Sequence, residues 1–383
     1  MGRTATSLNT FEFPVTPAVM PSIVAARPQR KAKPALLEFF AGSGLVSQAL
    51  APYFSLSWAN DICPKKAAIF RVNQGADNFH LGSITAVNGA SLPEAILSWA
   101  SFPCQDLSLA GKSGGIQASR SGLVWEWLRV MDEMPQRPAV LVAENVLGLV
   151  SSDGGSQYRQ LHKALVERGY KAGAMVIDAV RWLPQSRPRV FVVAVPLELQ
   201  IPKSLLDYSS NWLHPTSMVK AAKGLGGWLW WKLPEPAPRR LTLSDIIDWE
   251  APCLDEGAAA RTISLISEDH LRRFMESDLK AAPGYKRTRQ GRQVLELRFD
   301  DIAGCLRTPQ GGSSRQFLVL KREGRLDVRL LTVLETARLM GAPGTYKLPG
   351  GYNEGYKAMG DAVAVPAAVY LAKHLLSKLA AIV

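Results

Sequence analysis

The sequence has few cysteines, and their spacing excludes the common uses of paired cysteine. The four are Cys63, Cys104, Cys253 and Cys305, with no C-x-x-C pair and no histidine at the spacing of a zinc finger. We therefore expect no disulfide framework, no metal and a reducing, cytoplasmic setting. No uninterrupted apolar run reaches the roughly 18 residues of a membrane-spanning helix. Prolines interrupt the apolar segment 13–26, which argues against a signal peptide.

Strong compositional bias is also absent. The 383 residues are 47% hydrophobic and 20% charged, as in folded domains rather than disordered chains. The 31 glycines and 25 prolines follow no period, which excludes collagen-like and solenoid repeats. A chain of this length is expected to form two or three domain-sized units.

Acidic residues are outnumbered in two segments, which concentrates the net charge of +12. Residues 280–329 hold twelve Lys or Arg against five Asp or Glu, and residues 1–33 hold five against one. A basic region beside a nearly neutral body predicts a surface that binds a polyanion such as nucleic acid. On charge alone, a solubilising face with a basic tail stays open as the alternative.

Short apolar runs alternate with amphipathic stretches from Pro34 to about Val195. The predicted strands are 35–39, 56–59, 96–100, 139–143, 174–178 and 190–195, and the predicted helices are 64–73, 123–134 and 157–168. This alternation predicts an α/β fold with a doubly wound, mostly parallel sheet. Ligands of such sheets bind beyond the carboxyl ends of the strands.

The whole chain divides into four predicted parts. Residues 1–33 form a basic, flexible N-terminal arm, and residues 34–199 form the sheet domain. Residues 200–327, rich in Pro, Trp and Arg, form a second, smaller, irregular domain, whose tryptophans at 228–231 are interpreted as core rather than as a base-stacking platform. Periodic order returns in predicted helices at 329–340 and 366–379, so residues 328–383 are expected to complete the first domain.

A glycine-rich turn follows the first predicted strand. The strand 35–39 runs into Phe40-Ala-Gly-Ser-Gly44, where glycines let the backbone approach a nucleoside and Glu38 can meet a positively charged or hydroxylated ligand group. About twenty residues later, Asp61 ends the next strand, a place suited to ribose hydroxyls. No P-loop lysine follows the glycines, which disfavours a triphosphate. A tight strand-to-helix turn without a ligand is the alternative.

Three further motifs adjoin predicted strands. Cys104, in Pro103-Cys104-Gln105, follows strand 96–100 and precedes a loop rich in Gly and Ser. A lone cysteine is commonly a small buried hydrophobe, but one at the carboxyl end of a strand beside a loop is a candidate nucleophile. Glu144-Asn-Val146 also follows an apolar strand, and Gln185-Ser-Arg-Pro-Arg189 precedes the last one.

The ordered series Phe-Ala-Gly-x-Gly, Pro-Cys-Gln, Glu-Asn-Val and Gln-x-Arg-x-Arg resembles the cytosine carbon-5 DNA methyltransferase family. Residues 329–341 resemble that family's late conserved helix, and residues 360–363 resemble its last cofactor motif. The resemblance covers about 35–195 and 328–380 in the family's order. It implies a Rossmann-like catalytic and cofactor-binding domain, with 200–327 in the place of the target-recognition domain.

The resemblance also implies a mechanism. A Cys104 thiolate would attack carbon 6 of a flipped-out cytosine, and carbon 5 would then accept the methyl group of S-adenosylmethionine, leaving S-adenosylhomocysteine. Glu144 would hold or protonate ring nitrogen 3. Arg189, supported by Arg187, would contact the carbonyl oxygen of the base. A base would later remove the carbon-5 proton and so release Cys104.

For the cofactor, the resemblance places Phe40 against adenine, Gly42 and Gly44 beside the methionine part, and Asp61 at the ribose hydroxyls. The full implied set is Phe40, Ala41, Gly42, Ser43, Gly44, Asp61, Ile62, Ser83, Ile84, Pro103, Asp361, Ala362 and Val363. The chain departs from the family pattern in having Glu38 for Asp, Ile62 for an aromatic residue, Ser83 for Asp, Ser101 for Gly and Asp361 for Asn.

The implied partner is double-stranded DNA, contacted through Gln105, Ser108, Arg120, Arg307 and Arg315. An arginine can pair with guanine, although a phosphate contact or a solvated charge is the alternative for each. We expect a monomer in the cytoplasm (at the nucleoid if bacterial), no membrane partner, and a restriction endonuclease or phage-defence proteins as candidate associates. Two other functions stay open: a tRNA cytosine-5 methyltransferase on the same framework, and a catalytically silent DNA-binding homologue.

Overall fold

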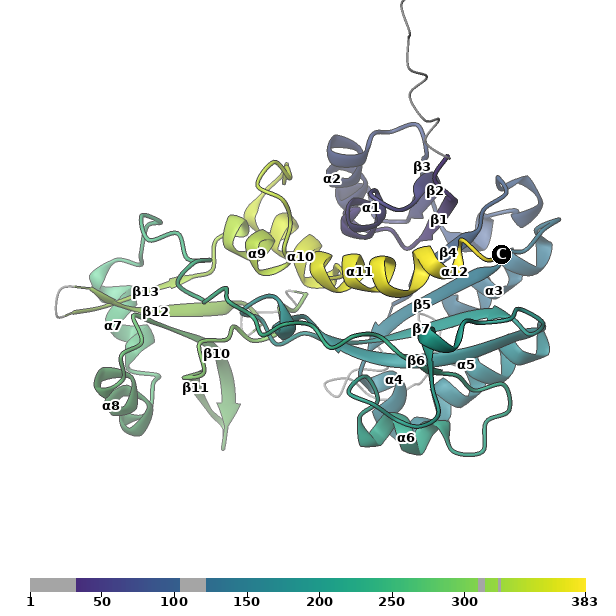
Figure 1. Ribbon diagram of the computed structural model, residues 1–383. Coiled ribbons are helices and arrows are strands. Elements are labelled where there is room, and N and C mark those ends of the chain that lie inside the picture. Colours follow the sequence, from purple (N-terminus) through teal and green to yellow (C-terminus); the bar gives the residue numbers. More distant parts are fainter. Residues whose placement is uncertain (1–31, 104–121, 309–313, 323–324) are drawn as a thin grey trace, which may run out of the picture. The chain divides into compact units, whose positions relative to one another are not determined.

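The computed structural model describes residues 32–103, 122–308, 314–322 and 325–383. Contacts group Lys33–Val383 into one compact unit, whose elements Figure 1 labels. The predicted N-terminal arm, residues 1–33, lies almost wholly outside the described residues.

The first half of the described chain alternates strands and helices, as predicted. The strands are β1 (Ala35–Phe39), β2 (Ser55–Asp61), β3 (Phe79–Leu81), β4 (Leu97–Ser101), β5 (Val140–Val146), β6 (Tyr170–Asp178) and β7 (Pro188–Pro196). The helices are α1 (Leu45–Leu50), α2 (Pro64–Gln74), α3 (Leu123–Glu133), α4 (Gly148–Ser151) and α5 (Ser156–Glu167). The sequence analysis missed β3, which has three residues and lacks an apolar run.

The seven strands form one sheet in the order β3-β2-β1-β4-β5-β7-β6. Six strands run parallel, and β7 runs antiparallel to both of its neighbours, β5 and β6. The predicted doubly wound, mostly parallel sheet is confirmed. Because β7 is reversed, its first residues lie at the same edge as the carboxyl ends of the other strands. The residues just before β7 therefore reach the ligand-binding edge of the sheet.

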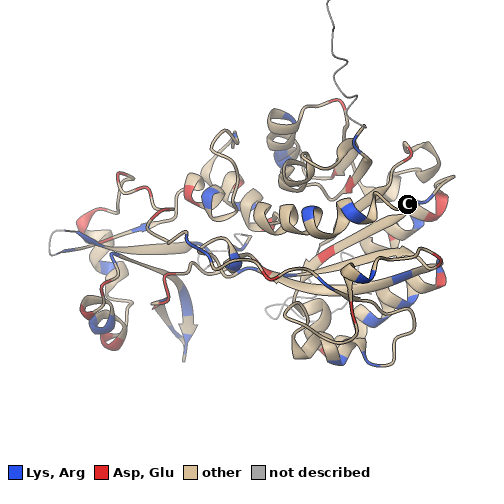
Figure 2. Cartoon of the chain, in the orientation of Figure 1, with Lys and Arg blue, Asp and Glu red and all other residues tan. Residues whose placement is uncertain are grey.

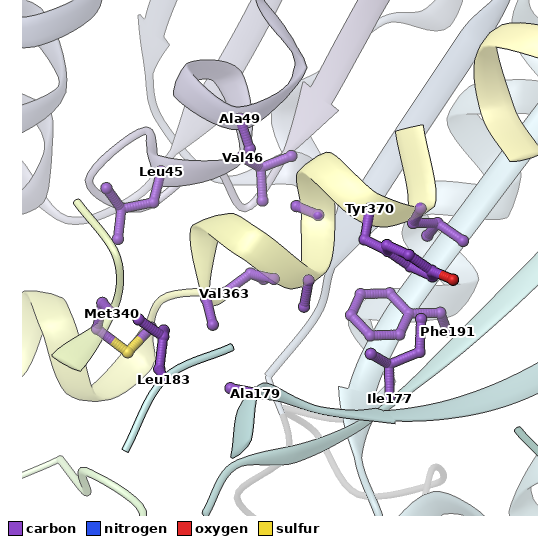
Figure 3. Close-up of a cluster of buried hydrophobic side chains, with 14 of the residues drawn as sticks. Leu45, Val46, Ala49, Ile177, Ala179, Leu183, Phe191, Met340, Val363 and Tyr370 are labelled. Carbon is purple, nitrogen blue, oxygen red and sulfur yellow. The ribbon is translucent and has the colours of Figure 1, made fainter. Parts of the chain in front are cut away.

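Both faces of the sheet are covered, which explains the continuous apolar runs of its strands. One core contains Trp99 and packs against α1 and α11 (Val365–Leu371). The other contains Ala100 and packs against α3, α5 and α6 (Thr216–Ala222). Figure 3 shows side chains of α1 facing α11, with Tyr370 of α11 beside Phe191 of β7. The C-terminal segment thus packs on the sheet that the N-terminal half of the chain builds.

The C-terminal segment begins with a shorter helix than the predicted 329–340. Strand β13 extends to Leu330, so α9 spans only Val333–Leu339. It is followed by α10 (Tyr352–Asp361), α11, a π-helical turn (Ala372–Leu376) and α12 (Ser377–Leu379). The predicted helix 366–379 therefore corresponds to three consecutive helical pieces.

The segment predicted as irregular contains a second sheet, which the sequence analysis did not specify. Its order is β11 (Arg292–Leu297), β10 (Ala281–Arg289), β12 (Gln316–Arg322) and β13 (Arg325–Leu330), all antiparallel. Along β12, Leu318 packs into the core of the first sheet, whereas Val319 packs on the opposite face, with Phe274 of α8 (Glu268–Glu276). Helix α7 (Glu256–Ile263) precedes α8. Burial on both faces makes the β12 sequence a continuous apolar run without alternation.

Residues from about 205 to 247 are loop-rich, with the short strands β8 (Leu206–Asp207) and β9 (Trp230–Trp231). Leu213 and Leu243 belong to the core of the first sheet. Trp231 is fully buried there and donates its indole N–H to Gly173 O at 3.1 Å, so it is a core residue, as interpreted. The segment 200–327 therefore does not pack as one body, and its predicted boundaries stay predictions.

By length and composition alone, one helical stretch, Tyr352–Leu379, is apolar enough to cross a membrane, with a hydropathy of 1.2. The sequence analysis, which required an uninterrupted apolar run, did not anticipate it. Within the protein, 56% of its most apolar window is buried. The backbone is also extended at Ala362 and Ala364, which separates α10 from α11. One such stretch is weak evidence for a membrane span, because buried core helices pass the same test.

Candidate active site

The predicted motifs meet at the carboxyl edge of the sheet. Ser101 at the end of β4 lies opposite Glu144 of β5, and Val146 of β5 lies opposite Arg189 of β7. Glu144 and Arg189 therefore share a face of the sheet. Their side chains form an ion pair, with Arg189 Nε 3.2 Å from Glu144 Oε1.

The carboxyl group of Glu144 is almost fully buried. Burial raises its pKa above the ordinary value, although Arg189, Arg187 and a hydrogen bond from Ser101 act in the opposite direction. Ser101 Oγ in turn accepts the indole N–H of Trp99 at 2.9 Å. A carboxyl group with a raised pKa beside a guanidinium can carry a proton closer to neutral pH than an exposed glutamate can.

Arg187 is 1% exposed, and its guanidinium links two distant parts of the chain. Nη1 donates to Leu306 O at 3.1 Å, while Nη2 donates to Gly360 O at 2.8 Å and Ala362 O at 2.5 Å. The backbone N–H of Arg187 donates to Asp178 Oδ1 at 2.7 Å. Arg187 thus fixes the connection between β11 and β12 against the C-terminal cofactor motif.

Cys305 lies beside both arginines, and the sequence analysis gave it no role. Arg187 Nη1 is 3.4 Å from Cys305 Sγ, and both terminal nitrogens of Arg189 are 3.9 Å from it. Burial would raise the pKa of the Cys305 thiol, but Arg187, Arg189 and Arg307 outweigh it, and the pKa is lowered. Cys305 lies more than a hundred residues from the Gln-x-Arg-x-Arg motif in the sequence, so no local pattern predicted that the two would meet.

Asn145 holds the chain directly before the predicted nucleophile. Its Nδ2 donates to Phe102 O at 3.2 Å, and its Oδ1 accepts the N–H of Val146 at 2.8 Å. Asn145 belongs to the Glu-Asn-Val motif, but the sequence predicted no role for it. Cys104 itself lies outside the described residues, as do Gln105, Ser108 and Arg120.

The glycine-rich turn has the backbone conformation that its sequence predicts. Phe40, Gly42 and Gly44 all have positive φ, at 56°, 57° and 85°. A Cβ on Gly44 would lie 2.8 Å from the ring of Phe70, so only glycine fits there. The N–H of Gly42 donates to Asp61 Oδ2 at 2.9 Å. The turn between β1 and α1 therefore contacts the acid at the end of β2, a hydrogen bond that the sequence did not predict.

Asp61 and its neighbours have hydrogen-bonding groups and apolar surface available to contact a nucleoside. Oδ1 of Asp61 accepts the N–H of Cys63 at 2.8 Å, which fixes the carboxylate and leaves lone pairs for hydroxyl donors. Ile62 is 68% exposed, an unusual state for a large apolar side chain. In the described part of the chain, Ser43 Oγ and Asn60 Oδ1 are buried without a hydrogen-bond partner. These residues fit a nucleoside-containing cofactor.

The remaining predicted cofactor residues are less uniform in exposure. Ser83 is half-buried and caps a short 3₁₀ turn, accepting the N–H of Thr85 at 3.2 Å. Ile84 is buried in the core of the sheet. Ala41 is buried, and Pro103 is half-buried at the last described position before Cys104.

Glu38 does not meet a ligand group, contrary to expectation. It is 1% exposed, and its carboxyl group pairs with the hydroxyl of Ser47 in α1. Burial raises the pKa of Glu38 to about 8, with Asp61 adding to the rise. Glu38 is therefore largely protonated at neutral pH.

The raised pKa of Glu38 predicts a loss of stability with rising pH. Between pH 4.5 and about 8 the unfolded chain releases this proton and the folded chain keeps it, so the free energy of unfolding falls. We expect roughly 2–3 kcal/mol of this fall between pH 6 and 8, removed in Glu38→Gln, whose amide mimics the neutral acid. Urea denaturation at the two pH values measures the difference. Glu126→Gln, at a partly exposed position of α3, serves as control, and an unchanged slope in Glu38→Gln would contradict the assignment.

The C-terminal motif lies near α2 and the connection between β11 and β12 of the second sheet. Lys66 Nζ of α2 is 2.6 Å from Asp361 Oδ2, and the hydroxyl of Thr308 donates to Asp361 Oδ1. A Cβ on Gly360 would lie 2.8 Å from the backbone of Arg307, so glycine allows this close approach. Val363 is buried in the core, as Figure 3 shows.

A basic pocket of about 710 Å³ lies between the second sheet and the start of β7. Its lining includes Arg287, Arg289, Arg298, Arg307, Tyr285, Cys305 and Pro188. Figure 2 shows Lys and Arg residues, in blue, on the strands of this sheet. Arg307 is exposed and lies 5.9 Å from the ring of Tyr285. Arg315, by contrast, is half-buried and donates to Asn353 Oδ1 at 2.5 Å.

A doubly wound sheet with a glycine-rich turn after β1 and an acid ending β2 is typical of enzymes that bind a nucleoside-containing cofactor. Within the described residues, no group of His, Cys, Asp or Glu could hold a metal ion. The model of the C-5 cytosine-specific DNA methylase family matches residues 35–377. The chain therefore belongs to this family of S-adenosylmethionine-dependent enzymes, and it is a DNA (cytosine-5-)-methyltransferase.

The individual relatives that the chain matches are consistent with this family. The chain is 26% identical over 339 residues to the Type II methyltransferase M.BsuFI of Bacillus subtilis, covering 88% of this chain and 71% of that one. It is 25% identical over 363 residues to M1.ScrFI of Lactococcus lactis subsp. cremoris, covering 94% and 82%. The fold is similar to that of the Entamoeba histolytica methyltransferase EhMeth, with a TM-score of 0.61, 14% identity and coverage of 91% and 99%. The fold is also similar to that of the S. pombe Dnmt2 methyltransferase, with a TM-score of 0.57 and 19% identity, covering 91% of this chain and 98% of that one.

Proposed function

We propose that the protein methylates carbon 5 of a cytosine flipped out of a specific double-stranded DNA sequence, through a covalent bond to Cys104. The observation that carries this is the buried Glu144–Arg189 pair at the edge of the sheet, directly beside the end of β4. Cys104 follows Ser101 of β4 by three residues, and Asn145 holds the intervening Phe102. Acid and cation thus come from the adjacent strands β5 and β7, and in the sequence the proposed nucleophile follows β4, which pairs with β5.

Each side chain has a defined task in this reaction. The Cys104 thiolate forms a bond to carbon 6, and the electron pair of the carbon 5–carbon 6 double bond moves into the carbon 5–carbon 4 bond while the carbon 4–nitrogen 3 pair moves onto nitrogen 3. Carbon 5 thereby becomes nucleophilic enough to take the methyl group. Glu144 holds or donates a proton at nitrogen 3, where negative charge develops. Arg189, already oriented by Glu144, contacts the carbonyl oxygen of the base. A base then takes the carbon-5 proton, and the bond to Cys104 breaks.

S-adenosylmethionine supplies the methyl group when bound. Phe40, Asp61 and Ile62 would hold its nucleoside, and Gly42 and Gly44 would lie beside its methionine part. Asp361 to Val363 would line the same pocket. The fixed carboxylate of Asp61 and the exposed side chain of Ile62 support this placement.

The four arginines of the basic pocket support a nucleic acid substrate. Arg287, Arg289, Arg298 and Arg307 line the side of the pocket that the second sheet contributes, opposite Ser186 and Pro188. Phosphate neutralisation by such a surface positions DNA, and individual arginines can pair with guanine. We extend the proposal to a monomer acting in the cytoplasm beside a restriction endonuclease, which the Type II names of the relatives support.

Trapping with 5-fluorocytosine tests the proposal. Fluorine at carbon 5 blocks the final proton removal, so duplex DNA of mixed sequence with this base should form a denaturation-resistant adduct in the presence of S-adenosylmethionine. We expect the adduct in the wild type and in the control Cys253→Ala, and none in Cys104→Ala. An adduct that survives in Cys104→Ala would contradict the nucleophile assignment. An adduct with fluorinated tRNA alone would replace DNA by RNA as the substrate.

A further inference from the structure

Lys66 is an unusual residue for its position in the fold. It lies in the first turn of α2, where the helix dipole disfavours a positive charge, and its side chain is 18% exposed. Burial by itself disfavours the ammonium, but Asp361 and Asp61 outweigh it and raise the pKa of Lys66. A charged lysine held in this way costs stability unless its partners and a function compensate.

Lys66 lies close to residues of three predicted cofactor motifs. A Cβ on Gly42 would lie 3.9 Å from Cδ of Lys66, so the side chain passes beside the glycine-rich turn. Its ammonium is 2.6 Å from Asp361 Oδ2, while Asp61 contributes a second negative charge nearby. Lys66 therefore joins the turn after β1, the end of β2 and the C-terminal motif.

The Lys66–Asp361 pair also explains a departure from the family pattern, in which Asp361 stands where Asn is common. A carboxylate at this place adds a negative charge, and Lys66 neutralises it. Both side chains keep some exposure, 18% for Lys66 and 26% for Asp361. An ammonium has three donors and a carboxylate about four acceptor positions, so both can bind further groups.

We propose that Lys66 and Asp361 together bind the amino-acid end of the methyl donor, an inference that rests on the proposed function. Lys66 pairs with the α-carboxylate of the ligand, and Asp361 pairs with its α-ammonium. The carboxylate of the ligand then faces the ammonium of Lys66, and the ammonium of the ligand faces the carboxylate of Asp361, so all four charges are paired. Lys66 is thus a specificity-determining residue for ligands that carry the amino-acid group.

Titration calorimetry with two nucleosides separates this role from a structural one. S-adenosylhomocysteine carries the amino-acid group, and 5′-methylthioadenosine lacks it. For Lys66→Met we expect affinity for S-adenosylhomocysteine to fall about 10- to 100-fold, the range for a lost charged hydrogen bond. Affinity for 5′-methylthioadenosine should change less than twofold. In Lys66→Met/Asp361→Asn, affinity for S-adenosylhomocysteine should fall further, because the partner of the α-ammonium is lost as well.

Lys65→Met is the matched control. Lys65 is the preceding residue of α2, and it pairs at 2.5 Å with the partly exposed Glu354 of α10, so it joins the same two helices at the surface. We expect both affinities to stay unchanged in this variant. Thermal unfolding verifies that each variant is folded, and Lys66→Gln replaces Lys66→Met if the latter is not.

Equal losses for the two nucleosides in Lys66→Met, or no loss, would overturn this inference and leave the proposed function intact. If the wild type binds neither S-adenosylhomocysteine nor S-adenosylmethionine, the proposed function fails, and this inference fails with it.

Discussion

Replacing Glu144 by glutamine is expected to lower the turnover number of methyl transfer by about 10²- to 10⁴-fold, the usual contribution of a general acid or base. The amide keeps the shape of the side chain and can still accept a hydrogen bond. It cannot give a proton to the base or balance the charge of Arg189 across their 3.2 Å contact. Steady-state rates with a DNA that the wild type methylates measure the effect.

The pH dependence distinguishes proton donation by Glu144 from mere positioning. Burial raises the pKa of this carboxyl group, so its acid form extends toward neutral pH. If the acid form acts, the wild-type turnover number falls as pH rises through that pKa. The fall should be absent from the residual rate of Glu144→Gln. Glu126→Gln, a surface change in α3, should keep the wild-type profile. A Glu144→Gln enzyme with more than half of the wild-type rate would contradict the assignment.

Replacing Arg187 by methionine is expected to lower the free energy of unfolding by about 3 kcal/mol. The change leaves three buried carbonyl oxygens, those of Leu306, Gly360 and Ala362, without their donors, and each such loss costs about 1 kcal/mol or more. Arg187→Lys retains the charge but cannot reach three acceptors in a plane, so we expect an intermediate loss. Urea denaturation measures both variants.

A surface arginine provides the control for Arg187. Arg272 is largely exposed and pairs with Asp269 within α8, so Arg272→Met should change the free energy of unfolding by less than about 1 kcal/mol. We also expect Arg187→Met to weaken binding of S-adenosylhomocysteine, because Gly360 and Ala362 belong to the cofactor motif. Wild-type stability and wild-type binding in Arg187→Met would show that these hydrogen bonds have no structural role.

Local sequence patterns predicted the first sheet well because its strands are buried on both faces. The continuous apolar runs of β1, β4 and β5 are visible without any partner. The short β3 lacks such a run, and the strands of the second sheet could not be distinguished from irregular chain. In β12 the apolar run is as strong as in β5, but its neighbours carry many arginines, which obscure the pattern.

Within the site, residues adjacent to strands could be predicted and long-range contacts could not. Asp61 ends β2 and Glu144 lies near the end of β5, and the glycines of the turn, Gly42 and Gly44, allow the positive φ values found there. The rule that parallel strands end at one edge predicted where Asp61 lies, but not its hydrogen bond from the N–H of Gly42. Cys305 and Lys66 carried no local signal, because their partners lie more than a hundred residues away in the sequence.

The sequence by itself determined the α/β class, the ligand-binding turn and the order of motifs, because strand burial and glycine conformation depend on local residue types. Only the tertiary structure decided that β7 is reversed, which brings Arg187 and Arg189 to the carboxyl edge of the sheet. It also decided that Arg187 binds backbone carbonyls and that Lys66 pairs with Asp361. Strand direction and long-range pairing depend on how distant segments pack together, and no local pattern of residues encodes them.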